Sequence, residues 1–103
     1  MFEVRTTALF DRWLGKLRDH KAQAIIAHQV QRLSAGNLGD VKAVAKGVSE
    51  LRIHFGPGYR VCLTQRGEKI IVLLCGGDKG SQKRDIARAV ELSKQVKEEE
   101  YGS

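Results

Sequence analysis

The order of apolar and polar positions predicts one strand and two helices in the first third of the chain. Residues Phe2 to Thr6 alternate in polarity, as a half-buried strand does, and Thr6 or Thr7 can cap a following helix. The next apolar residues recur at helical spacing: Phe10, Trp13, Leu14 and Leu17. A second periodic set follows: Ala22, Ile25, Ile26, Val30 and Leu33. We therefore expect a helical hairpin that ends at Gly36-Asn37.

The second half of the chain has the pattern of a sheet. Three strands are expected, at Val48 to Phe55, Tyr59 to Gln65 and Lys69 to Cys75. Short turns at 56–58 and 66–68 separate them, which predicts a three-stranded antiparallel meander. The run 70–74 is apolar at every position, so this strand should lie centrally with both faces covered. Residues 38–46 are expected to form the loop that leads into the sheet.

The end of the chain predicts a third helix. Gly76-Gly77 should break the last strand, and Ser81 can cap a helix. Its apolar positions fall on one side: Ile86, Ala89, Val90 and Val96. The expected architecture is α+β, in the order β-α-α-β-β-β-α, with the helical hairpin packed on an antiparallel sheet. Residues 1–97 should form a single domain, and 98–103 a frayed acidic tail.

The composition of the chain indicates a single domain with a basic surface. A chain of 103 residues, 42% hydrophobic and 29% charged, suits a single modest core. Its 18 Lys and Arg against 12 Asp and Glu give a net charge of +6, and the excess lies within residues 1–90. Such a charge favours a polyanionic partner: RNA, DNA, a ribosome or an acidic protein. Without a signal peptide or a spanning helix, we expect a cytoplasmic protein and no membrane partner.

Two strands carry the first group of candidate functional residues. Because side chains alternate along a strand, Arg52 and His54 share one face, and the tight turn can bring Arg60 to the same face. Two arginines and a histidine there indicate phosphate binding and proton transfer. The alternative is a solvated sheet face on which Glu50 pairs with one arginine.

The start of the last helix carries the second group. Lys79, Lys83 and Arg84 surround main-chain N–H groups that favour phosphate at a helix N-terminus. The segment lacks the spacing of a phosphate-binding Walker loop, which argues against a nucleoside triphosphate. The alternative is a solvated first turn after a glycine pair. Cys62 and Cys75 lack the paired spacing of a zinc site and are expected to be buried thiols, so no metal or cofactor is predicted.

These residue types together suit metal-independent cleavage of RNA, in which the ribose 2′-OH attacks the neighbouring phosphate. His54 could exchange protons near neutral pH, while Arg52 and Arg60 hold the phosphate oxygens. Lys79 or Lys83 would neutralise the charge that develops in the transition state. DNA would be spared because it lacks the 2′-OH.

Four segments of the sequence are distinctive, in order: GNLGDVK (36–42), GVSELRI (47–53), FGPGYRV (55–61) and LLCGGDK (73–79). A fifth is QKRDI at 82–86. In these segments the chain resembles the addiction-module killer proteins related to phage Gp49 and HigB, in the RelE/ParE superfamily. The resemblance implies a RelE-like toxin fold, neutralised by a cognate antitoxin that often carries a helix-turn-helix domain. Operator DNA would then be contacted only through the antitoxin.

The resemblance further implies an mRNA interferase, an endoribonuclease that inhibits translation by cutting mRNA, commonly on the ribosome. Basic residues that bind the scissile phosphate in RelE-like members match Arg52, Arg60 and Lys79. RelE has a tyrosine near its last helix, where this chain has Ile86, and the role of His54 is inferred from its chemistry alone. Two alternatives stay open: a ParE-like inhibitor of DNA gyrase without catalytic activity, and an inactive antitoxin-bound co-repressor.

Overall fold

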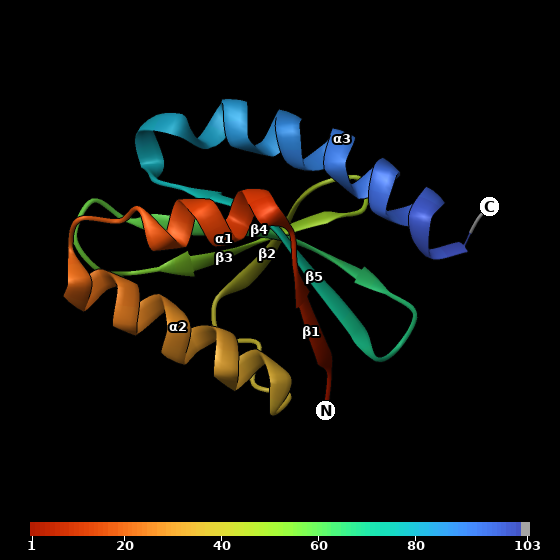
Figure 1. Ribbon diagram of the computed structural model, residues 1–103, viewed down its shortest axis with the longest axis horizontal. Helices are drawn as coiled ribbons and strands as arrows, with labels where there is room; N and C mark the ends of the chain where they lie inside the picture. The colour runs from red at the N-terminus through yellow and green to blue at the C-terminus, as the bar shows by residue number, and fades with distance from the viewer. Residues whose placement is uncertain (102–103) are drawn as a thin grey trace.

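The protein folds around one mixed sheet. In this computed structural model the backbone of residues 1–101 and the side chains of residues 1–96 are described. The strands are β1 (Glu3–Thr6), β2 (Val41–Ala45), β3 (Val48–Ile53), β4 (Tyr59–Arg66) and β5 (Ile70–Gly77). They lie in the order β1-β5-β4-β3-β2, with β1 parallel to β5 and all other neighbours antiparallel. Figure 1 shows this sheet with the helices around it.

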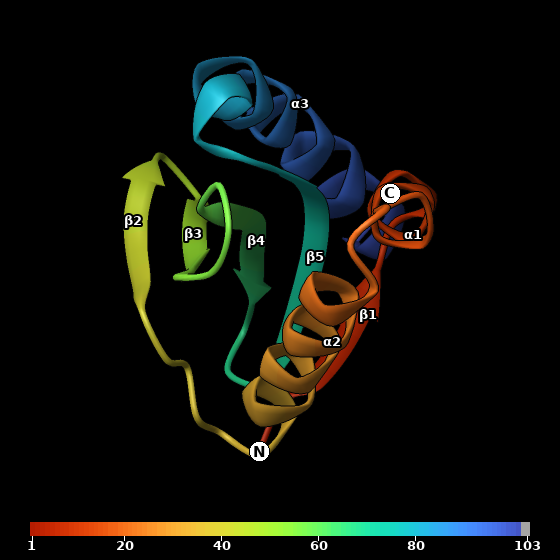
Figure 2. The same cartoon turned by 90° about the vertical axis from the view of Figure 1, so that its left-hand side faces the viewer.

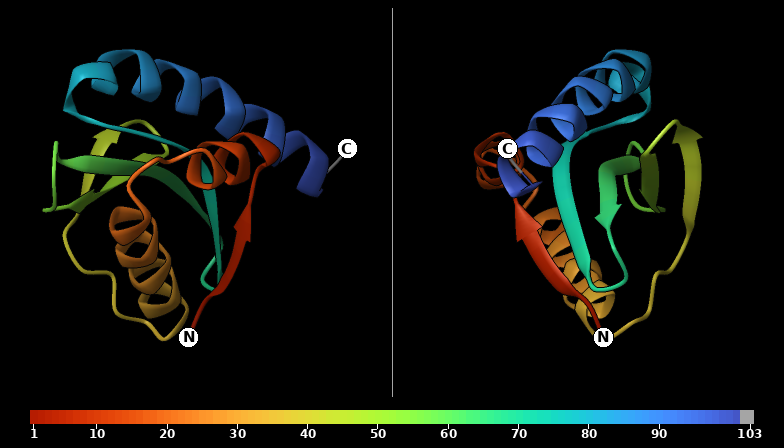
Figure 3. Two further views of the ribbon diagram at one scale, coloured as in Figure 1. Left: turned by 60° about the vertical axis from the view of Figure 1, so that its left-hand side comes forward. Right: turned by 90° about the vertical axis from the view of Figure 1, so that its right-hand side faces the viewer.

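Helices cover both faces of the sheet. The helices are α1 (Ala8–Gly15), α2 (His20–Ser34), the 3-10 turn η1 (Lys79–Ser81) and α3 (Gln82–Tyr101). Side chains of α1 and α2 pack against one face, around Leu51, Val61 and Leu73. Side chains of α3 pack against the other face, around Cys62 and Leu74. Figure 3 shows α3 and α2 on opposite sides of the strands. The expected covering of the last strand on both faces is therefore confirmed.

The start of α1 and the end of α2 have the capping residues that the sequence predicts. The Thr7 side chain caps α1 by accepting a hydrogen bond from the Phe10 amide at 3.1 Å. After α2, Gly36 takes a φ of 93°, and its amide donates to the Leu33 carbonyl oxygen. This left-handed residue closes the last turn of the helix. The predicted cap and the predicted stop are both confirmed.

The expected loop at 38–46 is wrong for most of its length. Val41–Ala45 forms β2, which pairs antiparallel with β3 and lies at the outer edge of the sheet, as Figure 2 shows. Gly47, with a φ of 77°, lies in the turn between the two strands. An edge strand needs only one hydrogen-bonded neighbour, and this one is short and rich in alanine. Its sequence signal was therefore weak.

Gly76 and Gly77 do not break the last strand, because β5 continues through Gly77. A Cβ on Gly76 would lie 2.3 Å from the Trp13 ring, and one on Gly77 would lie 1.9 Å from an Asp85 carboxylate oxygen. These glycines therefore make room for neighbouring side chains rather than for a turn.

Both ends of the last helix differ from the expected ones. Asp78, rather than Ser81, is the N-cap residue of η1, and the Asp78 amide donates a hydrogen bond to the Ser81 hydroxyl oxygen. The helix that follows continues through Tyr101, past residue 97. Residues 102 and 103 of the expected tail lie outside the described residues.

Candidate functional site

The sheet topology gathers the candidate residues at one end of the sheet. His54 follows the end of β3, Arg60 is the second residue of β4, and Lys79 follows the end of β5. Since these strands are antiparallel neighbours, Arg52 lies opposite Arg60, and Arg60 lies opposite Gly77. Arg52 and Arg60 thus share the sheet face on the side of α3, as strand alternation predicted.

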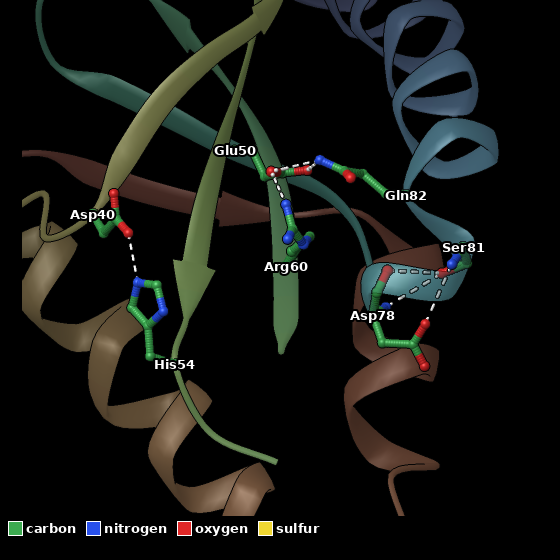
Figure 4. Close-up of polar contacts among 7 residues, drawn as sticks. All are labelled: Asp40, Glu50, His54, Arg60, Asp78, Ser81 and Gln82. Carbon is green, nitrogen blue, oxygen red and sulfur yellow. Dashed lines mark hydrogen bonds and ion pairs between the residues drawn. The ribbon is translucent and has the colours of Figure 1, made fainter. Parts of the chain in front are cut away.

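Glu50 holds one of the two arginines. Arg60 Nη1 donates to Glu50 Oε1 at 2.9 Å, and Gln82 Nε2 donates to the same oxygen at 3.2 Å (Figure 4). Glu50 is 1% exposed, and the Arg60 side chain is 18% exposed. A buried carboxylate requires such partners because its desolvation is costly. The pairing foreseen in the alternative interpretation therefore exists, and Gln82 joins it from the first residue of α3.

The arginine pair still carries more positive charge than Glu50 balances. Arg52 and Arg60 face each other directly across the ladder, and like charges in that position repel. Within the described part of the chain, the Nε atom of each is buried without a hydrogen-bond partner. Such an atom in a native protein calls for an explanation, because an unsatisfied buried donor costs free energy. Arg66 Nε, at the other end of β4, is also buried without a partner among these residues, so such donors do not by themselves mark an anion site. A bound anion would offset the excess positive charge of the pair.

The expected strand through Phe55 ends at Ile53, so His54 lies beyond β3, apart from the arginine pair, and contacts Asp40. His54 Nε2 lies 2.6 Å from Asp40 Oδ2, and the two side chains are 72% and 47% exposed (Figure 4). Asp40 is anchored beside β3, because its carbonyl oxygen accepts from the Arg52 amide at 2.9 Å. The hydrogen bond from His54 lowers the pKa of Asp40, and the charge of Arg52 adds to this effect. Asp40 is therefore a carboxylate at neutral pH.

That hydrogen bond decides the tautomer of the neutral His54 ring. A carboxylate only accepts hydrogen bonds, so Nε2 of His54 must be the donor. In the neutral ring the lone pair then lies on Nδ1. His54 is thus held with a free basic nitrogen at the end of the sheet that carries the two arginines.

The start of the last helix is less open to anions than the sequence suggests. Asp78 Oδ1 accepts hydrogen bonds from the amides of Gly80 and Ser81, at 2.8 and 3.2 Å. The main-chain donors expected to meet a phosphate thus already meet a carboxylate. Lys79, Lys83 and Arg84 are exposed around this turn, so their side chains remain accessible to a polyanion.

Residues 12–97 match the family model described as phage derived protein Gp49-like. The chain belongs to the Gp49-like family. This is a family of addiction-module toxin-like proteins. A protein of Haemophilus influenzae (strain Rd) described as uncharacterized is 45% identical over 94 residues, which cover 91% of this chain and 95% of that protein.

Sequence reasoning missed a cleft in this Gp49-like protein. About 620 Å³ in volume, it lies between α1 and the start of α3, beside the end of β5. Its walls include Trp13, Leu17, Tyr59, Gly77, Arg84 and Arg88. The close fit of Trp13 on Gly76 is the feature that shapes it, and this contact joins residues too far apart in the chain for a local pattern to reveal.

The remaining chemistry-bearing groups are structural. Cys62 and Cys75 lie opposite each other in β4 and β5 as free, buried thiols, as predicted. A hydrogen bond with Cys75 and burial raise the pKa of the Cys62 thiol. Among the described residues, no group of three or more His, Cys, Asp or Glu side chains could hold a metal ion. No helix in that part of this Gp49-like protein is long and apolar enough to cross a membrane.

Proposed function

We propose that this Gp49-like protein is the toxin of a type II toxin–antitoxin pair in the RelE/ParE superfamily, and that it cleaves mRNA without a metal ion. The observation that carries the proposal is the arginine pair Arg52 and Arg60, whose two charges face a single carboxylate among the described residues, at the end of the sheet where Asp40 contacts His54. Cations for a phosphate and an oriented base are the groups that RNA cleavage requires.

The reaction begins at the ribose. Nδ1 of His54 takes the proton of the 2′-OH, whose oxygen attacks the adjacent phosphorus atom. The bond from phosphorus to the 5′ oxygen breaks, and this oxygen takes a proton from water. The products are a 2′,3′-cyclic phosphate and a 5′-hydroxyl end. Asp40 stabilises the imidazolium that forms, as a positioning residue.

The two arginines stabilise the negative charge of the phosphorane. Guanidinium groups bind phosphate oxygens with two hydrogen bonds in a fixed geometry. Glu50 holds Arg60 in position through Nη1, whereas no side-chain hydrogen bond of this kind holds Arg52 among the described residues. Exposed Lys79, Lys83 and Arg84 extend the positive surface along the RNA.

The partners follow from this function. A cognate antitoxin, of the kind that carries a helix-turn-helix domain, would neutralise the toxin and contact operator DNA. Messenger RNA on the ribosome would be the substrate. Such an antitoxin should suppress growth arrest when the two proteins are produced together.

The test is mapping of RNA 5′ ends after induction, with the Arg52→Gln variant as comparison. Arg52 is the better residue to change, because removing Arg60 would leave Glu50 buried without its cation. New 5′-hydroxyl ends with the wild type, and their loss with folded Arg52→Gln, are expected. Growth arrest with DNA damage and without new RNA ends would refute the proposal in favour of gyrase inhibition. Folded protein without growth arrest would favour the inactive co-repressor.

A further inference from the structure

The cleft beside the end of β5 has a wall of aromatic side chains. The Trp13 and Tyr59 ring centroids are 6.3 Å apart at an interplanar angle of 65°, and the Phe10 ring lies 5.9 Å from Trp13. Gly76 allows the Trp13 ring to lie directly against β5, so the ring is fixed in place. Trp13 and Tyr59 are half-buried and keep part of their surface in the cleft. Rigid aromatic rings of this kind stack on nucleobases.

The opposite wall carries two arginines beside two aspartates. Arg84 and Arg88 lie one helical turn apart on α3, both exposed, and neither forms a salt bridge within the described residues. The carboxylates of Asp78 and Asp85 accept hydrogen bonds from the η1 amides and from the Ser81 hydroxyl. The two arginines are therefore the groups of this wall that are left to bind an anion.

The cleft adjoins the arginine pair. Gly77, which lines the cleft, lies opposite Arg60 in the β4–β5 ladder. Tyr59 precedes Arg60 in β4, but its side chain lies on the other face of the sheet. The cleft volume of about 620 Å³ is within the range of small-molecule sites, roughly 300–1,000 Å³. A chain bound with one phosphate at Arg60 would reach the cleft with a neighbouring residue.

We infer that this cleft binds one nucleotide of single-stranded RNA, with its base against Trp13 and Tyr59 and its phosphate at Arg84 and Arg88. This inference rests on the proposed function and adds to it a subsite for the nucleotide next to the scissile phosphate. An aromatic wall facing a cationic wall matches the two halves of a nucleotide. RNA is therefore favoured over a peptide of the antitoxin.

Trp13 provides a direct measurement, because it is the single tryptophan of the chain. The probe is a 2′-O-methyl trinucleotide, which cannot be cleaved through its 2′ position. Saturable quenching of Trp13 fluorescence is expected with this probe. Inorganic phosphate and an abasic analogue of the same length should not quench at the same concentrations.

Charge removal tests the cationic wall. The double variant Arg84→Gln/Arg88→Gln should raise the Kd of the trinucleotide at least tenfold. The matched control, Arg32→Gln/Lys46→Gln, removes the same charge from exposed positions outside the cleft and should leave the Kd within a factor of about two, since those charges act only through screened long-range attraction. Circular dichroism would establish that both variants are folded.

Three results would overturn the inference. They are unchanged Trp13 fluorescence, an equal loss of affinity in the control variant, or a cleft variant that loses antitoxin binding but keeps the trinucleotide. The proposed function fails by a different result, the absence of new RNA 5′ ends in cells. A protein that cleaves RNA without a response of Trp13 would keep the function and lose the subsite.

Discussion

Glu50 and Arg60 form a buried ion pair between β3 and β4, and Gln82 at the start of α3 completes it. The pair joins the sheet to the last helix at the end of the molecule where the candidate site lies. Arg60 is therefore held in place by Glu50, whereas Arg52 can be replaced without leaving a buried carboxylate unpaired.

We expect Arg60→Met to destabilise the protein by about 3–5 kcal/mol, because it leaves the Glu50 carboxylate buried without its cation. The double variant Glu50→Gln/Arg60→Met should regain more than half of that loss. Urea unfolding followed by circular dichroism measures both. If Arg60→Met alone were as stable as the wild type, the ion pair would have no part in holding α3 on the sheet.

His54→Gln should slow RNA cleavage by about 10²-fold or more, the usual contribution of a general base. Asp40→Asn should have a smaller effect, because the base remains but the carboxylate that orients its ring is lost. Single-turnover cleavage of a defined RNA measures both rates, and the loss should be smaller for Asp40→Asn than for His54→Gln. Equal rates for wild type and His54→Gln would exclude His54 as the base.

The Asp40–His54 contact should also give stability a pH dependence on the acid side. The hydrogen bond from His54 lowers the pKa of Asp40 below the ordinary value of an aspartate. A carboxyl whose pKa is lower in the folded state stabilises that state above the unfolded pKa, and this contribution disappears as pH falls through the folded pKa. The wild type should therefore lose its advantage over Asp40→Asn below about pH 4. Thermal unfolding of both proteins between pH 3 and 6 measures it, and an unchanging difference would contradict the contact.

Gly76→Ala should destabilise the protein by about 1–3 kcal/mol, because the new methyl group would overlap the Trp13 ring and force it away from β5. The emission of Trp13 should change as its surroundings open. Gly15→Ala is the matched control, since a Cβ at that position meets no atom within 4 Å. Equal stability of the two variants would show that the ring does not lie against Gly76.

Cys62 and Cys75 should react with a thiol reagent only when the protein opens. Both are buried between the sheet and α3, and the pKa of Cys62 is raised, so little thiolate forms there. With the thiol reagent 5,5′-dithiobis(2-nitrobenzoate) at pH 8, the thiols of the folded protein should react at least about 10²-fold more slowly than those of the urea-unfolded protein. Rapid reaction of both thiols in the folded state would contradict their burial.

Much of the fold follows from short-range patterns. Thr7 and Gly36 act at single helix ends, where the capping side chain or the left-handed backbone is a property of a few neighbouring residues. β2 escaped prediction because an alanine-rich edge strand is stabilised by its pairing with β3 more than by its own sequence. The strand break predicted at Gly76-Gly77 was wrong for a similar reason. These glycines leave space for the side chains of Trp13 and Asp85, which belong to other elements.

The sequence by itself placed Arg52 and Arg60 on one face, because strand alternation and a tight turn are local geometry, whereas His54 lies beyond the end of β3 and contacts Asp40. It also supplied the positive charge and the segments that carry the family resemblance. Tertiary structure alone decided that Glu50 takes Arg60, that Asp40 orients His54, and that Trp13 and Arg88 face one cleft. Each of those contacts joins different secondary-structure elements or loops, so it depends on how helices and strands pack, which no local pattern encodes.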